Sequence, residues 1–413
     1  MAFFAAAQLT VNTGSEKTIK LEKQIDSILF DAIRHKAFPG CVVYASQKDR
    51  ILFFKSYGHY TYDSIKRVEN NSIYDLASIT KVVGGTLALM KLYEDSLIHP
   101  DDPIKKYVDG LGKRVGEVTI REALAHQGGL YPWIPYYQKI RKKNGAFKKK
   151  YISNALSEKY PFELSDNLFL RKDFYHVIKR FIKKSEVTKT PSYKYSGLFF
   201  YLVPELVEKL SGQKYTDFLQ THFFDPLKAK TVGFSPLDRF SKELIAPTEV
   251  DSFFRMEPIH GKVHDEGAIM MQGVSGNAGL FSNAIDLAKV MQLLLNDGVH
   301  DTLQLLKPHT IDLFNTVQYP NLKNRRALGF DKPLLQYDSV RSSVAKSSSR
   351  KSFGHTGYTG TLAWADPKND LVYIFLSNRV YPSRKNTAIY KLNVRPAIHQ
   401  LIYDYLGSGN EVN

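Results

Sequence analysis

Residues 75–81 read Asp-Leu-Ala-Ser-Ile-Thr-Lys, and the interpretation of the whole chain starts from this stretch. It places Ser78 and Lys81 three positions apart, directly before an apolar run. On a helix, residues at i and i+3 share one face with Cβ atoms about 5–6 Å apart, which brings hydroxyl and amine within hydrogen-bond reach. A helix N-terminus also favours a developing oxyanion and a neutral lysine. The stretch predicts a serine nucleophile activated by a lysine.

The Ser-x-x-Lys spacing alone is a weak signal. It occurs elsewhere in the chain, for example at Ser343–Lys346 and Ser348–Lys351, in a polar tract without helical periodicity that we interpret as solvated loop. Without other motifs, Ser78 would be interpreted as a helix N-cap and Lys81 as a surface residue.

Two further motifs follow in a fixed order. Tyr195-Ser196-Gly197 precedes an apolar helix, and His355-Thr356-Gly357 leads into a predicted strand. The order Ser-x-x-Lys, Tyr-Ser-x, His-Thr-Gly resembles the penicillin-recognising serine hydrolases, which include class C β-lactamases, DD-peptidases and related esterases. Further similar segments at 124–130, 205–227 and 276–282 extend the resemblance over most of residues 20–405.

The resemblance implies a role for each motif. Ser78 would be the nucleophile of an acyl-enzyme mechanism, and Lys81 and Tyr195 would share the proton transfers. The substrate would be an ester or an amide, and the resemblance implies neither a cofactor nor a metal.

The same resemblance implies where the oxyanion and the substrate bind. The oxyanion would lie between the backbone N–H groups of Ser78 and Tyr358. His355, Thr356 and Gly357 would line the substrate site along one strand.

Two positions depart from the family's pattern. The family's Tyr-x-Asn ends here in Gly197, which removes a side-chain amide that binds the substrate's acylamide group. His355 stands in place of a lysine, which weakens the positive charge that recognises a substrate carboxylate. Both departures argue against an efficient β-lactamase and leave an esterase, an amidase or a D-amino-acid peptidase.

The apolar pattern predicts an α+β fold, and the resemblance implies that this fold is of the β-lactamase/DD-peptidase type. Alternating apolar runs predict strands at residues 41–45, 51–54, 361–365 and 371–377. Helical spacing predicts helices at residues 19–33, 82–92, 201–210, 284–295 and 387–405. In the second of these, Gly84 and Gly85 would permit close backbone packing.

Strands at both ends and helices in the middle predict two structural units. Residues 19–95 and 330–407 would form an antiparallel sheet flanked by helices. Residues 96–329 would form an inserted, mainly helical unit.

The positive charge of the chain is concentrated in one segment. The 413 residues contain 57 Lys and Arg against 41 Asp and Glu, a net charge of +16, and residues 131–191 alone contain 15 against 5. The basic, aromatic-rich segment 131–190 would be a solvated face, a surface for an anionic cell-envelope polymer, or, least favoured, a nucleic-acid site. A non-catalytic protein of the same fold that binds such a polymer is therefore the alternative function.

Several other features receive ordinary structural interpretations. Cys41 is the single cysteine, which excludes an internal disulfide and a cysteine-based zinc site. The cluster at residues 260–266 contains two histidines and two acids but lacks a metalloprotease helix motif, so we interpret it as a hydrogen-bonded loop. His126, before a Gly-Gly turn, is interpreted as structural.

The ends of the sequence leave the cellular location open. No run of about 18 apolar residues is present. The apolar stretch at residues 1–12 lacks a basic region and fits either a trimmed signal or a frayed terminus. Because proteins of the resembling family are mostly exported, we expect a periplasmic or cell-envelope location.

Overall fold

One five-stranded antiparallel sheet organises the protein. The computed structural model describes residues 15–48, 50–188 and 192–407, so the apolar stretch at residues 1–12 lies outside the described residues. The strand order is β12-β13-β14-β1-β2. These strands are β1 (Gly40–Gln47), β2 (Arg50–Gly58), β12 (Phe353–Thr356), β13 (Leu362–Asp366) and β14 (Leu371–Ser377). Both ends of the chain build this sheet, which confirms the predicted α+β class.

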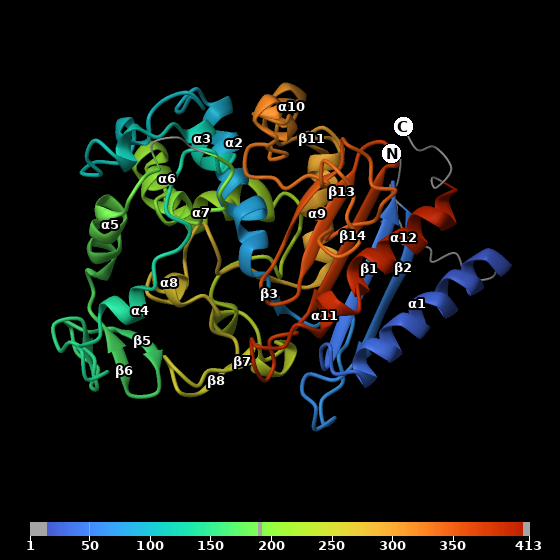
Figure 1. Ribbon diagram of the computed structural model, residues 1–413, viewed down its shortest axis with the longest axis horizontal. Helices are drawn as coiled ribbons and strands as arrows, with labels where there is room; N and C mark the ends of the chain where they lie inside the picture. The colour runs from blue at the N-terminus through green and yellow to red at the C-terminus, as the bar shows by residue number, and fades with distance from the viewer. Residues whose placement is uncertain (1–14, 49, 189–191, 408–413) are drawn as a thin grey trace, which may run out of the picture.

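Helices cover both faces of the sheet because both faces carry apolar side chains. Cys41, Val43 and Ala45 of β1 belong to the core under α1 (Glu16–Arg34) and α12 (Val394–Leu406). Val42 and Tyr44 point into the opposite core, which contains α9 (Ala284–Leu295). Figure 1 shows α1 and α12 side by side on their face of the sheet.

The position of α9 bears on the predicted division of the chain. The helix lies within residues 96–329, yet it packs against β13, β14 and β1. The range predicted as an inserted unit therefore includes a helix, α9, that packs on the sheet built from the two ends of the chain. The division itself, with 19–95 and 330–407 in one unit, stays a prediction.

The ends of α1 follow from its sequence. Ser15 caps the helix by accepting the Thr18 N–H at 3.1 Å. Its buried side chains, at spacings of four and three residues, are Leu21, Ile25, Leu29 and Ala32. The predicted helix at residues 19–33 is thereby confirmed.

One prediction differs from the structure, and one small sheet was not predicted. The helix predicted over residues 387–405 is interrupted, with α11 (Ala388–Lys391) separated from α12 by Asn393 in a left-handed conformation, φ +51°. The middle of the chain also contains a small sheet of order β4-β6-β5 that the sequence analysis missed. Its strands are β4 (Ile152–Ser153), β5 (Phe162–Ser165) and β6 (Leu168–Leu170). Such short strands leave too little alternation to identify.

The remaining elements are short. The helices are α2 (Leu87–Glu94), α3 (Ile120–Leu124), α4 (Tyr136–Lys139), α5 (Phe174–Lys184), α6 (Val203–Ser211), α7 (Tyr215–Leu219), α8 (Glu266–Ile269) and α10 (Pro308–Asn315). The paired strands are β3 (Tyr74–Asp75) with β9 (Phe281–Ser282), β7 (Glu249–Val250) with β8 (Pro258–Ile259), and β10 (Val299–His300) with β11 (Leu303–Gln304). Within the described ranges, no helix has the length and apolarity needed to cross a membrane.

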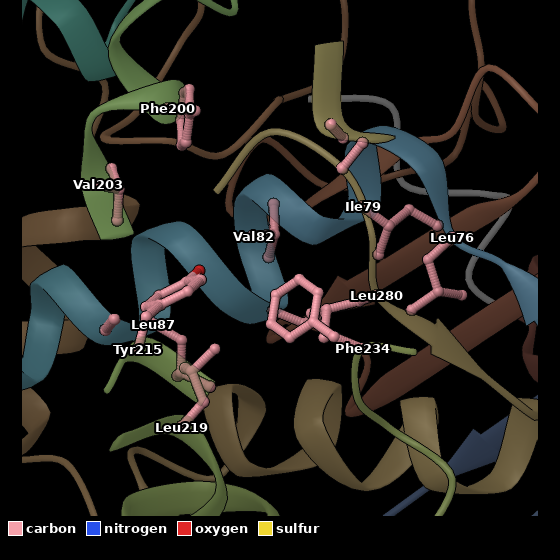
Figure 2. Close-up of a cluster of buried hydrophobic side chains, with 14 of the residues drawn as sticks. Leu76, Ile79, Val82, Leu87, Phe200, Val203, Tyr215, Leu219, Phe234 and Leu280 are labelled. Atoms are coloured by element: carbon pink, nitrogen blue, oxygen red, sulfur yellow. The ribbon is translucent and has the colours of Figure 1, made fainter. Parts of the chain in front are cut away.

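The segment after Ser78 runs through the larger hydrophobic core. Figure 2 shows the side chains around it, namely Leu76, Ile79, Val82, Leu87, Phe200, Val203, Tyr215, Leu219, Phe234 and Leu280. A Cβ atom at Gly85 would lie 2.9 Å from Phe200 Cδ1 and 3.0 Å from the Gly276 carbonyl oxygen. The predicted close packing at the glycine pair is confirmed, because any larger residue would push these segments apart.

A buried histidine on α12 makes stability depend on pH. His399 is fully buried between the rings of Tyr373 and Tyr403, at centroid distances of 4.5 and 4.9 Å. Burial lowers its pKa to about 3. In the unfolded chain a histidine titrates near pH 6.5, so between these two values the unfolded state binds more protons. The contribution of His399 to stability is therefore lost as the pH falls from about 6.5 towards 3.

We expect the substitution His399→Asn to flatten this pH dependence. The asparagine oxygen can accept the Ala345 N–H that His399 Nδ1 accepts at 3.4 Å, and it does not titrate. Between pH 7 and pH 4.5, the unfolding free energy of the wild type should fall by roughly 2–3 kcal/mol more than that of the variant. Chemical denaturation at both pH values measures this difference, with His309→Asn, at an exposed site, as control. Parallel pH profiles for the wild type and His399→Asn would contradict the assignment.

Candidate active site

Ser78 lies in a strained turn. It belongs to the 3₁₀ turn Ala77–Ile79, and a π-helical turn, Lys81–Thr86, follows before α2 begins. Ala77 has φ +46°, in the left-handed region that costs a non-glycine residue about 1–2 kcal/mol. The prediction of a regular helix starting at Ser78 is therefore wrong in detail. Local strain of this kind is typical of functional sites.

Hydrogen bonds tie this turn to the end of the large sheet. The Asp75 carboxylate accepts the Ala77 N–H at 2.8 Å. Thr359 Oγ1 donates to the Asp75 carbonyl at 2.8 Å, and Thr361 Oγ1 donates to the Leu76 carbonyl at 3.3 Å. The loop between β12 and β13 therefore fixes the backbone directly before Ser78.

The structure brings Ser78, Lys81 and Tyr195 together. Lys81 Nζ donates to Ser78 Oγ at 2.9 Å, and the Tyr195 hydroxyl donates to the same oxygen at 3.2 Å. Lys81 Nζ also donates to the Asn277 carbonyl at 3.0 Å. Ser78 and Tyr195 are half-buried, whereas Lys81 is buried. A hydroxyl with both an amine and a phenol at hydrogen-bond distance can lose its proton as it attacks a carbonyl carbon.

The lysine is held by groups without negative charge. Its Nζ lies 5.4 Å from the ring centroid of Tyr195 and 5.6 Å from that of Phe200. Among the described residues, no carboxylate forms an ion pair with Lys81. The amine of Lys81 is therefore surrounded by neutral acceptors and aromatic faces.

His355 lies on β12 close to this group. Its ring centroid is 5.8 Å from that of Tyr195, and its Nδ1 donates to the Thr356 carbonyl at 2.7 Å. Burial, together with the charges of Arg326 and Lys81, lowers the pKa of His355 to about 3. The imidazole is thus neutral at pH 7, and Nε2, which has no hydrogen-bond partner among the described residues, is left as an acceptor.

The residues after His355 bring the end of β12 against the turn that contains Ser78. Thr356 is half-buried and Gly357 is buried. A Cβ atom at Gly357 would lie 2.0 Å from Thr361 Oγ1 and 2.5 Å from the Leu76 carbonyl oxygen, so only glycine fits. Tyr358 is 49% exposed and stacks on His264 at 5.7 Å.

The stack on His264 shows where the loop at residues 260–266 lies. His264 Nε2 is 2.7 Å from Glu249 Oε2, and His260 Nε2 donates to the Ile245 carbonyl at 2.6 Å. Throughout the described ranges, no cluster of three or more His, Cys, Asp or Glu side chains is arranged to hold a metal ion. The loop is hydrogen-bonded, as interpreted from the sequence, and it borders Tyr358.

Sequence reasoning underestimated His126. Its ring lies 4.5 Å from that of Tyr195, and its Nδ1 accepts the Ser196 N–H at 3.3 Å. Burial lowers the pKa of His126 well below its usual range. The neutral imidazole therefore packs directly against the tyrosine, whereas the turn sequence favoured a structural role.

Arg326 was not predicted, and Asn277 was noted only as part of the similar segment 276–282. The Arg326 guanidinium carbon lies 5.3 Å from the Tyr195 ring centroid, and its Nε contacts the Tyr193 hydroxyl and Asp331 Oδ1, each at 3.3 Å. A single arginine in an irregular segment carries no sequence signal. Asn277 acts through its backbone carbonyl, which side-chain patterns do not report.

The basic segment 131–190 begins beside the site and then leads away from it. Ser196 Oγ donates to the Tyr131 carbonyl at 2.6 Å, and the Gly197 N–H donates to the Pro132 carbonyl at 3.3 Å. Figure 1 shows that α4, β5, β6 and α5 of this segment lie on the side of the molecule opposite α1 and α12. The Arg141 guanidinium is engaged within the protein, because it donates to the carbonyls of Gly145 and Phe253 at 2.7 and 2.8 Å.

Comparisons with known proteins settle the family. The beta-lactamase family profile matches residues 25–395. The chain belongs to the beta-lactamase family. This membership confirms the resemblance inferred from the motifs and, with the names of its relatives, indicates a hydrolase.

Relatives of this beta-lactamase-family protein are named as a carboxypeptidase and an amidase. "Putative D-alanyl-D-alanine carboxypeptidase" of Escherichia coli O157:H7 is 30% identical over 370 residues, covering 83% of this chain and 79% of the relative. "N-acetylmuramyl-L-alanine amidase" of Bacillus subtilis (strain 168) is 28% identical over 398 residues, covering 90% and 83%. The solved structure of "EstCE1, a hydrolase with promiscuous acyltransferase activity" has a TM-score of 0.64 at 18% identity, covering 93% of this chain and all of that one. The "Novel Penicillin-Binding Protein (PBP) Homolog from Caulobacter crescentus" has a TM-score of 0.63 at 15% identity, covering 95% of this chain and 99% of that one, and these likenesses show the fold.

Gly357→Ala should destabilise the protein, because the added methyl group overlaps the Leu76 carbonyl and Thr361. We expect a loss of about 1–3 kcal/mol of unfolding free energy, measured by chemical denaturation. Gly197→Ala is the matched control, since its methyl group would meet only Lys81 Cε, at 3.9 Å. Its stability should change by less than about 0.5 kcal/mol. Equal effects of the two substitutions would show that the close approach at Gly357 is not a constraint.

Proposed function

We propose that the protein is a serine hydrolase that cleaves an ester or an amide through an acyl-enzyme. The arrangement of Ser78 Oγ, 2.9 Å from Lys81 Nζ and 3.2 Å from the Tyr195 hydroxyl, carries the proposal. Ser78 Oγ attacks the carbonyl carbon while its proton passes to Lys81 or Tyr195, and the same proton then goes to the leaving group. Water, deprotonated by the same pair, hydrolyses the ester to Ser78 and regenerates the enzyme.

The proposed oxyanion site lies between the N–H groups of Ser78 and Tyr358. The close approach of Gly357 to the Leu76 carbonyl supports it, because it brings the backbone that follows His355 against the turn that carries Ser78. Two preorganised N–H donors stabilise a tetrahedral intermediate by several kcal/mol. Thr356, half-buried beside them, is proposed to contact the substrate.

The proposed substrates are peptide or amide compounds of the cell wall, or esters. The names of the carboxypeptidase and amidase relatives support this class. Efficient β-lactam hydrolysis stays disfavoured. The neutral His355 provides no cation for a β-lactam carboxylate, and Gly197 provides no side-chain amide.

The binding-protein alternative has less support. A protein that only binds an anionic polymer does not require the Ser78, Lys81 and Tyr195 arrangement, and the comparisons give no support to such a polymer. Retention on anionic polymers that weakens with salt, without turnover of ester and D-peptide panels, would favour it. Nucleic acid remains the least favoured partner. A periplasmic or cell-envelope location is proposed from the names of the carboxypeptidase and amidase relatives.

A fluorophosphonate probe tests the nucleophile. We expect the probe to add one covalent label at Ser78, located by peptide mass mapping, and Ser78→Ala to remove the label and lower kcat by roughly 10⁴-fold or more. Ser343→Ala and Ser348→Ala change the serines of two other Ser-x-x-Lys matches and should leave both readouts intact. Labelling that persists in Ser78→Ala would disprove the assignment.

Tyr195→Phe tests the phenol. The substitution keeps the ring against His126 and Lys81 but removes the hydroxyl 3.2 Å from Ser78 Oγ. We expect kcat/KM for an activated ester to fall about 10²–10⁴-fold, the usual contribution of a positioned acid–base group. Tyr193→Phe removes a hydroxyl that contacts Arg326 instead, and it should cost less than about 10-fold. If the two variants behave alike, the hydroxyl of Tyr195 has no special role.

A further inference from the structure

A cavity lies away from Ser78, between α9, α10 and the start of β12. Its volume is about 410 Å³, within the range of small-molecule sites. None of the residues that line it belongs to the proposed catalytic group. They are Leu294, Leu295, Asp297, Ile311, Asp312, Asn315, Thr316, Val317, Lys332, Arg350, Lys351, Phe353 and Pro367.

The cavity contains a buried cation without an anionic partner. Lys332 is only 5% exposed, and its Nζ donates to Asn315 Oδ1 at 2.7 Å and to the Lys351 carbonyl at 2.9 Å. Both acceptors are neutral, and within the described ranges no carboxylate forms an ion pair with Lys332. An ammonium group has three N–H donors, so one remains for a ligand. Burial lowers the pKa of Lys332 to about 7, an effect that the charge of Asp366 only partly opposes.

Asp297 and Asp312 also line the cavity, but both are exposed, and neither forms an ion pair with Lys332 among the described residues. Two buried carboxylates are engaged elsewhere. Asp331, the preceding residue, binds Arg325 through both oxygens, at 2.9 and 3.1 Å. Asp366 accepts hydrogen bonds from Ser349 N–H at 3.0 Å and from the side chain of Tyr403. Neither carboxylate pairs with the Lys332 ammonium.

The rest of the lining divides into an apolar part and a charged part. Ile311 and Phe353 are buried apolar residues on its wall, and the Lys332 amine lies 5.8 Å from the Phe353 ring centroid. Arg350 is held by the carbonyls of Leu334 and Leu335, at 2.7 and 2.6 Å. A ligand with an apolar chain and one negative end matches this division.

We propose that this cavity binds a small aliphatic monocarboxylate, whose carboxylate pairs with Lys332 Nζ and whose chain lies against Ile311 and Phe353. An anion at this point offsets the cost of burying the lysine charge. Burial of the apolar chain against these side chains adds to the affinity. The proposal does not depend on the acyl-enzyme chemistry at Ser78.

Isothermal titration of the full chain with hexanoate tests the site. We expect one site per chain with a dissociation constant of about 1 mM or tighter, and binding of the neutral isostere hexanamide at least 10-fold weaker. Lys332→Gln should weaken hexanoate binding at least 10-fold, whereas Ser78→Ala should leave it unchanged. Lys351→Gln is the matched control, because it removes an equal charge but keeps the carbonyl that Lys332 contacts, and it should change binding less than 3-fold.

A second variant covers a failure of Lys332→Gln to fold. Val317→Trp fills part of the cavity at a half-buried position and keeps the lysine, so it should also abolish hexanoate binding. Equal affinity for hexanoate and hexanamide would overturn the proposal. Unchanged binding in either Lys332→Gln or Val317→Trp, or loss of binding in Ser78→Ala, would do the same.

Discussion

The buried amine of Lys81 is the constraint on which the rest of the site depends. A lysine that is almost completely inaccessible to solvent is costly unless hydrogen bonds satisfy its amine. Here the two acceptors are Ser78 Oγ, at 2.9 Å, and the Asn277 carbonyl, at 3.0 Å. These come from segments almost 200 residues apart in the chain. Both segments pack in the core shown in Figure 2, so the packing of this core also sets the positions of the groups around Lys81.

The turn that presents Ser78 is stabilised from outside itself. Ala77 adopts a backbone conformation that is unfavourable for alanine. The hydroxyls of Thr359 and Thr361 donate to the carbonyls of Asp75 and Leu76, and Gly357 allows their loop to approach the turn. The strand end and the nucleophile turn therefore form one rigid unit, which suits a reaction that needs fixed donors.

The sequence allowed the family and the larger elements to be predicted, because motif order and apolar periodicity are local properties. Ser78, Lys81, Tyr195 and His355 were each identified from short patterns. The π-helical turn after Ser78 was not, since it results from packing against distant segments rather than from local preference. Arg326 was missed for the same reason, because its contact with Tyr195 exists only in the folded chain.

The position of β14 at the centre of the sheet also affects how the chain folds during synthesis. β1 pairs with β14 from Cys41↔Ser377 to Gln47↔Leu371, although β1 leaves the ribosome more than 300 residues earlier. At typical translation rates of about 5–20 residues per second, the edge of β1 stays without its partner strand β14 for roughly 15–70 s. An unpaired apolar edge of this kind invites pairing with other chains. The protein therefore depends on late, long-range closure, and a nascent chain that stops before residue 371 has a sheet without its central strand.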